Sequence, residues 1–126
     1  MADVAEKEDA SMEMFVLVLN RVECLEPILE EMLEQGFGGA TILDSTGMLR
    51  VLDGDDNVDL PMLGLLRHFH NPERSRCKTL FAVIREEQRQ RLLDIINQKT
   101  GGLDQPDTGI AFTVPVNYAE GLNKKQ

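Results

Sequence analysis

The chain has 126 residues, a length that suits one domain whose core needs no disulfide or metal for stability. Its net charge of −9, from 13 basic and 22 acidic residues, argues against general nucleic-acid binding, in which basic side chains neutralise phosphates. The two cysteines, Cys24 and Cys77, are far apart and indicate neither a disulfide framework nor a zinc ribbon. The acidic first residues are not typical of a signal peptide, and no apolar run approaches the ~20 residues of a membrane helix, so we expect a cytoplasmic protein without membrane insertion.

The first predicted strand is unusually apolar. Residues 1–11 are expected to be a flexible tail, and a strand is predicted at Met12–Asn20. From Met14 to Leu19 this strand has no polar break. Because successive strand side chains point to opposite faces of a sheet, we expect the strand to be buried on both faces.

A helix is predicted next, at Val22–Gln35, from apolar residues at helical spacing. Asn20 and Glu23 fit a capping box at its start. Pro27 is tolerated only in the first turn of a helix and favours a start nearer Cys24. A glycine-rich segment then ends the helix.

A second strand is predicted from about Ala40 to Asp44, with Met48–Leu52 as a candidate continuation. A long connection, about residues 46–77, leads to a third strand at Lys78–Arg85. Connections of this length usually carry function or are disordered, so residues 50–76 are expected to be the most mobile internal segment. Within it, Leu60–Phe69 is apolar at helical spacing and is a candidate for a short helix.

A second helix is predicted at Glu86–Gln98 and a last strand at Gly109–Val116, with residues 121–126 as a polar tail. The order is βαββαβ, and right-handed crossovers place both helices on one face of an antiparallel sheet. This order predicts an α+β fold, the ferredoxin-like sandwich. Two helices cover only one face of the sheet, whereas the first strand is apolar on both, so we expect further copies of the chain to cover the other face.

Two segments at strand ends are candidate binding turns, one at Ser45-Thr46-Gly47 and the other at Thr108-Gly109. Small hydroxyl residues and glycine can expose backbone N–H groups to a ligand, although ordinary turns favour the same residues. A basic cluster between 67 and 78 is a candidate anion site or a set of solvated loop charges. The residues expected to contact a small anionic ligand are therefore Ser45, Thr46, Gly47, Met48, Arg74, Arg76, Lys78, Thr108 and Gly109.

Metal binding and catalysis have weaker signals. His68, His70 and Cys77 are candidate metal ligands, but histidines two residues apart diverge on a helix, and surface or interface histidines are the alternative. The acidic DGDDNVD segment fails the EF-hand pattern and is expected to be a solvated turn. Ser45 is not in a nucleophile elbow and no acid–base pair is apparent, so we expect no enzymatic activity; a small enzyme on the same scaffold is the disfavoured alternative.

About residues 12–120 resemble the PII signal-transduction (nitrogen regulatory) protein family. The resemblance lies in FVLVLNRVECLEPILEEMLEQGFGGATILDSTGM, KTLFAVIREEQRQRLLDIINQKTGG and TGIAFTVPV. It implies a homotrimer whose sheets pack inward, with a small-molecule effector, often an adenine nucleotide, in the clefts between subunits. The connection of about residues 46–77 would correspond to the family's T-loop, which signals to a target protein, and Gly101–Gly109 to its phosphate-facing B-loop.

The chain also departs from the family pattern. The usual B-loop reads TGxxGDGKIF, and Ile110 stands where its lysine would be. The T-loop lacks the usual tyrosine, since the only tyrosine is Tyr118. The resemblance therefore implies a divergent PII-like regulatory sensor, with an adenine nucleotide or a cyclic dinucleotide as candidate effector. The alternative is a trimeric metal-binding or structural protein like the copper-tolerance relatives of PII, with His68, His70 or Cys77 as ligands.

Overall fold

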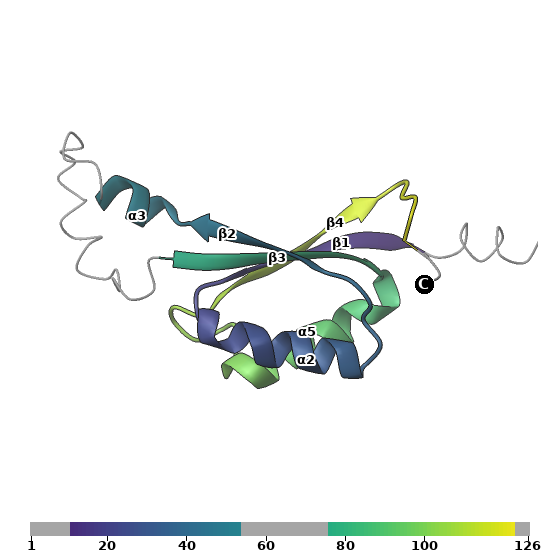
Figure 1. Ribbon diagram of the computed structural model, residues 1–126, viewed down its shortest axis with the longest axis horizontal. Coiled ribbons are helices and arrows are strands. Elements are labelled where there is room, and N and C mark those ends of the chain that lie inside the picture. Colours follow the sequence, from purple (N-terminus) through teal and green to yellow (C-terminus); the bar gives the residue numbers. More distant parts are fainter. Residues whose placement is uncertain (1–10, 54–75, 123–126) are drawn as a thin grey trace, which may run out of the picture.

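A computed structural model describes residues 11–53 and 76–122. Within them, four strands form one antiparallel sheet in the order β2-β3-β1-β4. The strands are β1 (Met12–Leu19), β2 (Thr41–Thr46), β3 (Arg76–Arg85) and β4 (Gly109–Val116). With two helices on one side of this sheet, the predicted α+β ferredoxin-like βαββαβ sandwich is confirmed (Figure 1).

Each of the two long helices starts with one 3-10 turn. The turn η1 (Val22–Cys24) leads into α2 (Leu25–Glu34), and η3 (Glu86–Gln88) leads into α5 (Arg89–Thr100). The α-helical part thus begins beyond Cys24, as Pro27 indicated. None of the helices in the described residues is long and apolar enough to cross a membrane.

The helix ends show where the expected caps were right and wrong. The capping box expected from Asn20 and Glu23 is wrong, because Arg21 precedes the first turn and no side chain caps it. At the other end of α2, Gly36 takes a φ of 90°, and the Phe37 N–H donates to the Met32 carbonyl oxygen at 2.8 Å. This is a Schellman arrangement, and it satisfies carbonyls that the helix itself leaves without partners.

The second strand differs from the expected Ala40–Asp44. It begins at Thr41 and extends to Thr46, because β3 starts two residues earlier than predicted and offers Cys77 and Arg76 as partners. The expected continuation into Met48–Leu52 is wrong. That segment forms the short helix α3 (Met48–Asp53), in which the Val51 N–H donates to the Gly47 carbonyl oxygen, and its Met, Leu and Arg residues are good helix formers.

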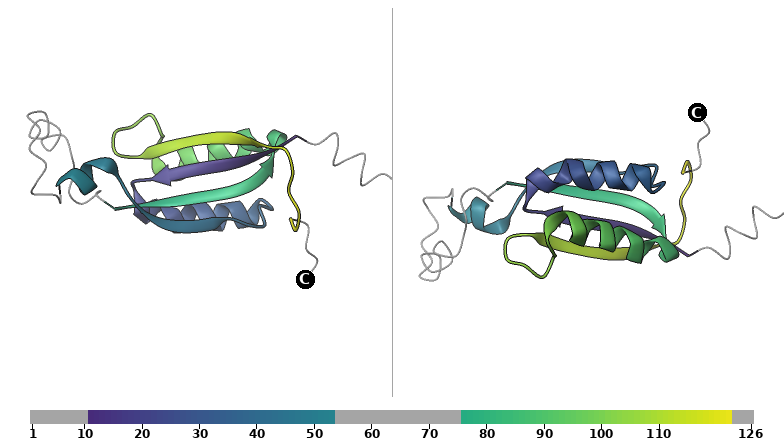
Figure 2. Two further views of the ribbon diagram at one scale, coloured as in Figure 1. Left: turned by 90° about the horizontal axis from the view of Figure 1, so that it is seen from above. Right: turned by 90° about the horizontal axis from the view of Figure 1, so that it is seen from below.

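The covered face of the sheet holds the hydrophobic core. In β1 the odd-numbered residues point toward α2 and α5, and the register with β3 places Leu17 opposite Leu80 and Phe15 opposite Ala82. From below the sheet, both helices lie across this face (Figure 2, right). Its fully buried side chains include Phe15, Leu17, Leu19, Ile28, Leu80, Leu92, Ile95 and Ile96.

The opposite face, which we call the open face, has no helix over it in the described residues (Figure 2, left). Pairing places Phe81, Val16 and Phe112 in one row across it, and Thr79, Val18 and Ile110 in the next row. Phe112 is 47% exposed and Ile110 is 62% exposed. The open face is formed by Met14, Val16, Val18, Leu43, Thr79, Phe81, Val83, Ile110, Phe112 and Val114.

One buried carboxylate interrupts the apolar covered face. Glu13, near the start of β1, accepts two hydrogen bonds from Arg89 at the start of α5, both at 2.7 Å. The hydrogen bonds from Arg89 hold the pKa of Glu13 below its ordinary value, against the opposing effect of burial. The pair therefore satisfies a charge that would be costly to bury alone, and it ties β1 to α5.

Candidate functional site

The predicted ligand residues that the structure describes lie at one end of the sheet, in or beside its opposite edge strands. Strand pairing sets Asp44, Lys78, Leu19 and Gly109 in one row across the four strands. We call this the Gly109 end of the sheet: β1 and β2 finish there, and β3 and β4 begin there (Figure 1). Three strand spacings of about 4.8 Å separate its two edges, so one chain cannot close a small ligand between them.

At the β2 edge, Ser45 is already held by the sheet. Its Oγ lies 2.8 Å from Thr79 Oγ1, 3.1 Å from the Cys77 carbonyl oxygen and 3.3 Å from Cys77 Sγ. Either hydroxyl can donate in the Ser45–Thr79 hydrogen bond, and where Thr79 donates, the Ser45 proton is free to go to Cys77. Ser45 is thus a strand residue and not the turn residue that was expected, whereas Thr46, Gly47 and Met48 are exposed.

The cations at this edge differ in what they contact. Lys78 Nζ forms an ion pair with Asp44. The hydrogen bond from Lys78, and then its charge, keep the pKa of Asp44 below the ordinary value, and Arg76 adds a smaller effect of the same sign. Arg76 is exposed at the first position of β3, opposite Thr46. Arg76 is therefore the better placed of the two to meet an anion, while Arg74 lies outside the described residues.

At the β4 edge, Thr108 and Gly109 already have close contacts within the chain. Thr108 is 1% exposed, and its carbonyl oxygen accepts from the Asn20 N–H at 2.9 Å and the Arg21 N–H at 3.4 Å. Gly109 has a φ of 149°, and a Cβ added there would lie 2.3 Å from the Val18 carbonyl oxygen. Glycine is needed at this position because the β1 backbone is so close, which is a structural reason independent of any ligand.

Residues 101–108, which we call the 101–108 loop, connect α5 to β4 and are acidic. They contain Asp104 and Asp107, and the sequence has no lysine or arginine from Thr100 to Val116. Several loop amides have partners within the chain: the N–H of Leu103 donates to Asn97 Oδ1 at 2.8 Å, and that of Gly102 donates to Thr100 Oγ1 at 3.2 Å. The loop therefore offers an anion neither a cation of its own nor these amides.

Arg21 was not expected to take part in this region. Its Nη1 donates to the Thr100 carbonyl oxygen at 2.7 Å and its Nη2 to the Pro106 carbonyl oxygen at 3.3 Å. Arg21 lies 79 and 85 residues from these partners in sequence. No local pattern could have indicated the contacts; only the fold brings the end of β1 beside the loop.

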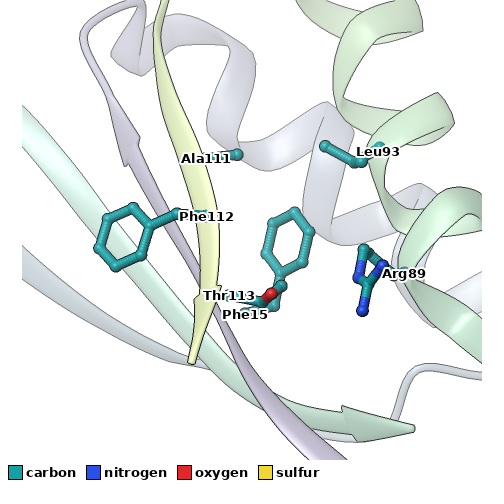
Figure 3. Close-up of a pocket in the computed structure, with 6 residues that line it drawn as sticks. All are labelled: Phe15, Arg89, Leu93, Ala111, Phe112 and Thr113. Carbon is teal, nitrogen blue, oxygen red and sulfur yellow. The ribbon is translucent and has the colours of Figure 1, made fainter. Parts of the chain in front are cut away.

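A shallow groove lies elsewhere, between α5 and the free edge of β4 (Figure 3). Its volume is about 290 Å³, and it is lined by Phe15, Arg89, Leu93, Ala111, Phe112 and Thr113. Phe15, Leu93 and Ala111 line its apolar part, while the Phe112 side chain points to the other side of β4 (Figure 3). The Arg89 guanidinium in the groove is already paired with Glu13, and the groove contains none of the predicted ligand residues.

The candidate metal ligands are not brought together in the part of the chain that the structure describes. Cys77 is buried beside Ser45, and His68 and His70 lie outside the described residues. Within residues 11–53 and 76–122, no three His, Cys, Asp or Glu side chains are close enough to hold a metal ion. In the same residues, every buried side-chain nitrogen or oxygen has a hydrogen-bond partner.

Comparison with solved structures identifies a known fold. The chain is similar to the PII protein of Arabidopsis thaliana, whose crystal structure was determined with citrate bound. The TM-score is 0.57 at 16% sequence identity, and the match covers 86% of this chain and 80% of that one. No protein-family model and no curated protein matches the sequence. At this identity the likeness establishes the fold, which is that of PII.

Proposed function

We propose that this chain, which has the PII fold, is a non-enzymatic PII-like regulatory sensor. It assembles as a homotrimer through the open face and binds a small anionic effector in the clefts between copies. An adenine nucleotide or a cyclic dinucleotide is the expected effector. The segment after β2 signals the bound state to a target protein, as in the family that the sequence resembles.

The open face carries this proposal. It presents apolar side chains from all four strands, including the exposed Leu43, Ile110, Phe112 and Val114. Burying apolar surface contributes about 25 cal/mol per Å², and contiguous exposed apolar surface marks interaction sites in soluble proteins. A sheet with two apolar faces needs a packed layer on each face, and the helices supply only one. Association of copies would supply the layer on the open face.

The two separated segments support a site between copies. Residues 45–48 lie at the β2 edge and residues 108–109 at the β4 edge, both at the Gly109 end of the sheet. A second copy that sets its β4 edge against the β2 edge of the first would bring the segments together. A single chain holds them apart, so the proposed site requires assembly.

The chemistry of the β2 edge supports an anionic effector. Arg76 is exposed beside Thr46, and residues 46–48 are exposed as well. A guanidinium with neighbouring hydroxyl and N–H donors makes charge-assisted hydrogen bonds to phosphate or carboxylate. The Arabidopsis PII structure contains citrate, a small anion, which agrees with this class of effector. The acidic 101–108 loop favours contact of the anion with the β2 edge of the cleft.

Calorimetry against ATP, ADP, AMP, cyclic di-AMP and citrate tests the proposal. We expect at least one of them to bind below millimolar concentration, and Arg76→Ala to weaken that binding about tenfold or more, as expected for the loss of a charged hydrogen bond. Arg91→Ala is the matched control. Arg91 lies on α5 over the Phe37 ring, so this variant removes the same charge away from the proposed site. If no probe binds, the effector proposal is wrong; a rise in melting temperature with Zn²⁺ or Cu²⁺ alone would favour the metal-binding alternative.

A further inference from the structure

Arg21 joins three parts of the chain at the Gly109 end of the sheet. Its guanidinium donates to the Thr100 carbonyl oxygen at the end of α5 and to the Pro106 carbonyl oxygen in the 101–108 loop. Its backbone N–H and that of Asn20 both donate to the Thr108 carbonyl oxygen. The same residue therefore contacts the beginning and the end of the loop as well as the residue that precedes β4.

The loop depends on a cation from outside its own sequence. The Arg21 guanidinium contacts the Pro106 carbonyl in the loop and the Thr100 carbonyl just before it. The Thr100 carbonyl lies at the C-terminal end of α5, the negative end of the helix dipole, where a cation is favourable. Asp104 and Asp107 make the loop acidic, and no basic residue follows until after Val116. Asp107 also takes a φ of 58°, a left-handed conformation that aspartate tolerates better than most non-glycine residues.

We propose that Arg21 is a positioning residue for the effector site: its side chain holds the 101–108 loop, which forms the β4 side of the proposed cleft. The proposal rests on the proposed function for the existence of that site. Arg21 acts on the effector through the loop. A guanidinium suits this role because its planar fork reaches two carbonyls at once, whereas a lysine ammonium is a point charge that cannot span them in the same fixed geometry.

Hydrogen exchange of the unliganded full chain tests the holding role without any effector. We expect Arg21→Ala to speed exchange at Gly101, Gly102, Leu103 and Gln105 about tenfold or more, since each of these N–H groups now has an acceptor in the chain. Exchange in the middle of β1 should not change, which shows that the fold persists. Arg21→Lys keeps the charge and should give an intermediate rate, and Arg91→Ala should leave the loop unchanged.

Effector affinity then tests the positioning role. Whichever of ATP, ADP, AMP, cyclic di-AMP and citrate binds the unaltered protein should bind Arg21→Ala about tenfold more weakly. Arg21→Lys should restore part of that loss, and Arg91→Ala should show none. A purely structural brace would lower the melting temperature while leaving the affinity of the folded protein unchanged.

The two proposals fail in different ways. Loop exchange that is the same in Arg21→Ala and the unaltered protein overturns the role of Arg21, whatever binds. Faster loop exchange with unchanged affinity restricts Arg21 to a structural brace and overturns the positioning role. If none of the five probes binds the unaltered protein, the effector proposal and the positioning role that rests on it both fail. The exchange data still decide whether Arg21 holds the loop.

Discussion

The two faces of the sheet are built from the same strands but are completed in different ways. On the covered face, Phe15, Leu17 and Leu19 are at most 1% exposed beneath α2 and α5. On the open face, Ile110 and Phe112 remain about half exposed in the single chain. The two helices cover one face of the sheet, whereas no helix of the described residues covers the apolar side chains of the open face.

Val16 shows that side chains of the open face also pack against one another. It lies on the open face, yet it is only 8% exposed because Phe81 and Phe112 flank it across the sheet. The open face therefore has a packed apolar centre and is not a scatter of single exposed residues. From this we infer that the covered face determines the stability of the chain and the open face its assembly.

The largest expected effect is a difference in unfolding free energy between matched variants of the two faces. Leu17→Ala removes a fully buried side chain from the covered face and should lower the free energy of unfolding by about 2–5 kcal/mol at every protein concentration. Ile110→Ala deletes a similar side chain from the open face and should cost under about 1 kcal/mol where the chains are dissociated. Urea unfolding at several protein concentrations measures both. Equal losses at high dilution would contradict the distinction between the faces.

A second prediction concerns β4, which carries three exposed apolar residues of the open face. Gly109→Ala would place a Cβ 2.3 Å from the Val18 carbonyl oxygen, so we expect a loss of roughly 1–3 kcal/mol as the start of β4 moves away from β1. Gly39→Ala is the control, because nothing lies within 4 Å of a Cβ there and its φ is not in the left-handed region. Thermal unfolding compares them. If both variants matched the unaltered protein, the close approach of β1 and β4 would be wrong.

The smallest expected effect is the pH dependence of the covered face. The pKa of Glu13 is lower in the folded chain than its ordinary value of about 4.3, chiefly because Arg89 donates hydrogen bonds to it. The pair therefore stabilises the fold fully above that value, and this contribution is lost as the pH falls through the folded-state pKa. Glu13→Gln should cost roughly 1 kcal/mol at pH 7, and the difference from the unaltered protein should shrink in acid.

Unfolding of the two proteins from pH 7 to pH 3 checks this prediction. Glu86→Gln is the control, since Glu86 Oε1 is 3.9 Å from Arg89 Nη2 and its side chain is mostly exposed. This variant should change stability little, because exposed ion pairs contribute about 0–1 kcal/mol. A Glu13→Gln variant with an undiminished deficit at pH 3 would show that the ion pair is not its cause.

Much of the architecture could be predicted from the sequence because it follows from side-chain periodicity. The unbroken apolar run from Met14 to Leu19 indicated two apolar faces, and the helical spacing around Ile28 and Ile95 indicated which sides of the helices are buried. The errors fell where tertiary context decides. The length of β2 depends on where β3 begins, and residues 48–52 are apolar enough to fit either a strand or a helix.

The candidate site was less predictable, because hydroxyl and glycine residues at strand ends have two explanations. Thr46 and Gly47 are exposed, as a binding turn requires, but Thr108 is buried and Gly109 is fixed by the approach of Val18. Arg21 had no sequence signal at all, since its partners are about 80 residues away. The expectations for residues 54–75, including Arg74, His68, His70 and the mobile connection, lie outside the described residues.

Light scattering of the full-length protein at low micromolar concentration, coupled to size exclusion, tests the central claim that the open face is an interface between copies. The unaltered chain should elute with the mass of three chains. Phe112→Asp, which places a charge midway along β4 on the open face, should shift it to one chain while the circular dichroism of the fold persists. The exposed charge reversal Arg91→Asp on α5 should remain trimeric. An unaltered protein that stays monomeric at these and higher concentrations would contradict the account.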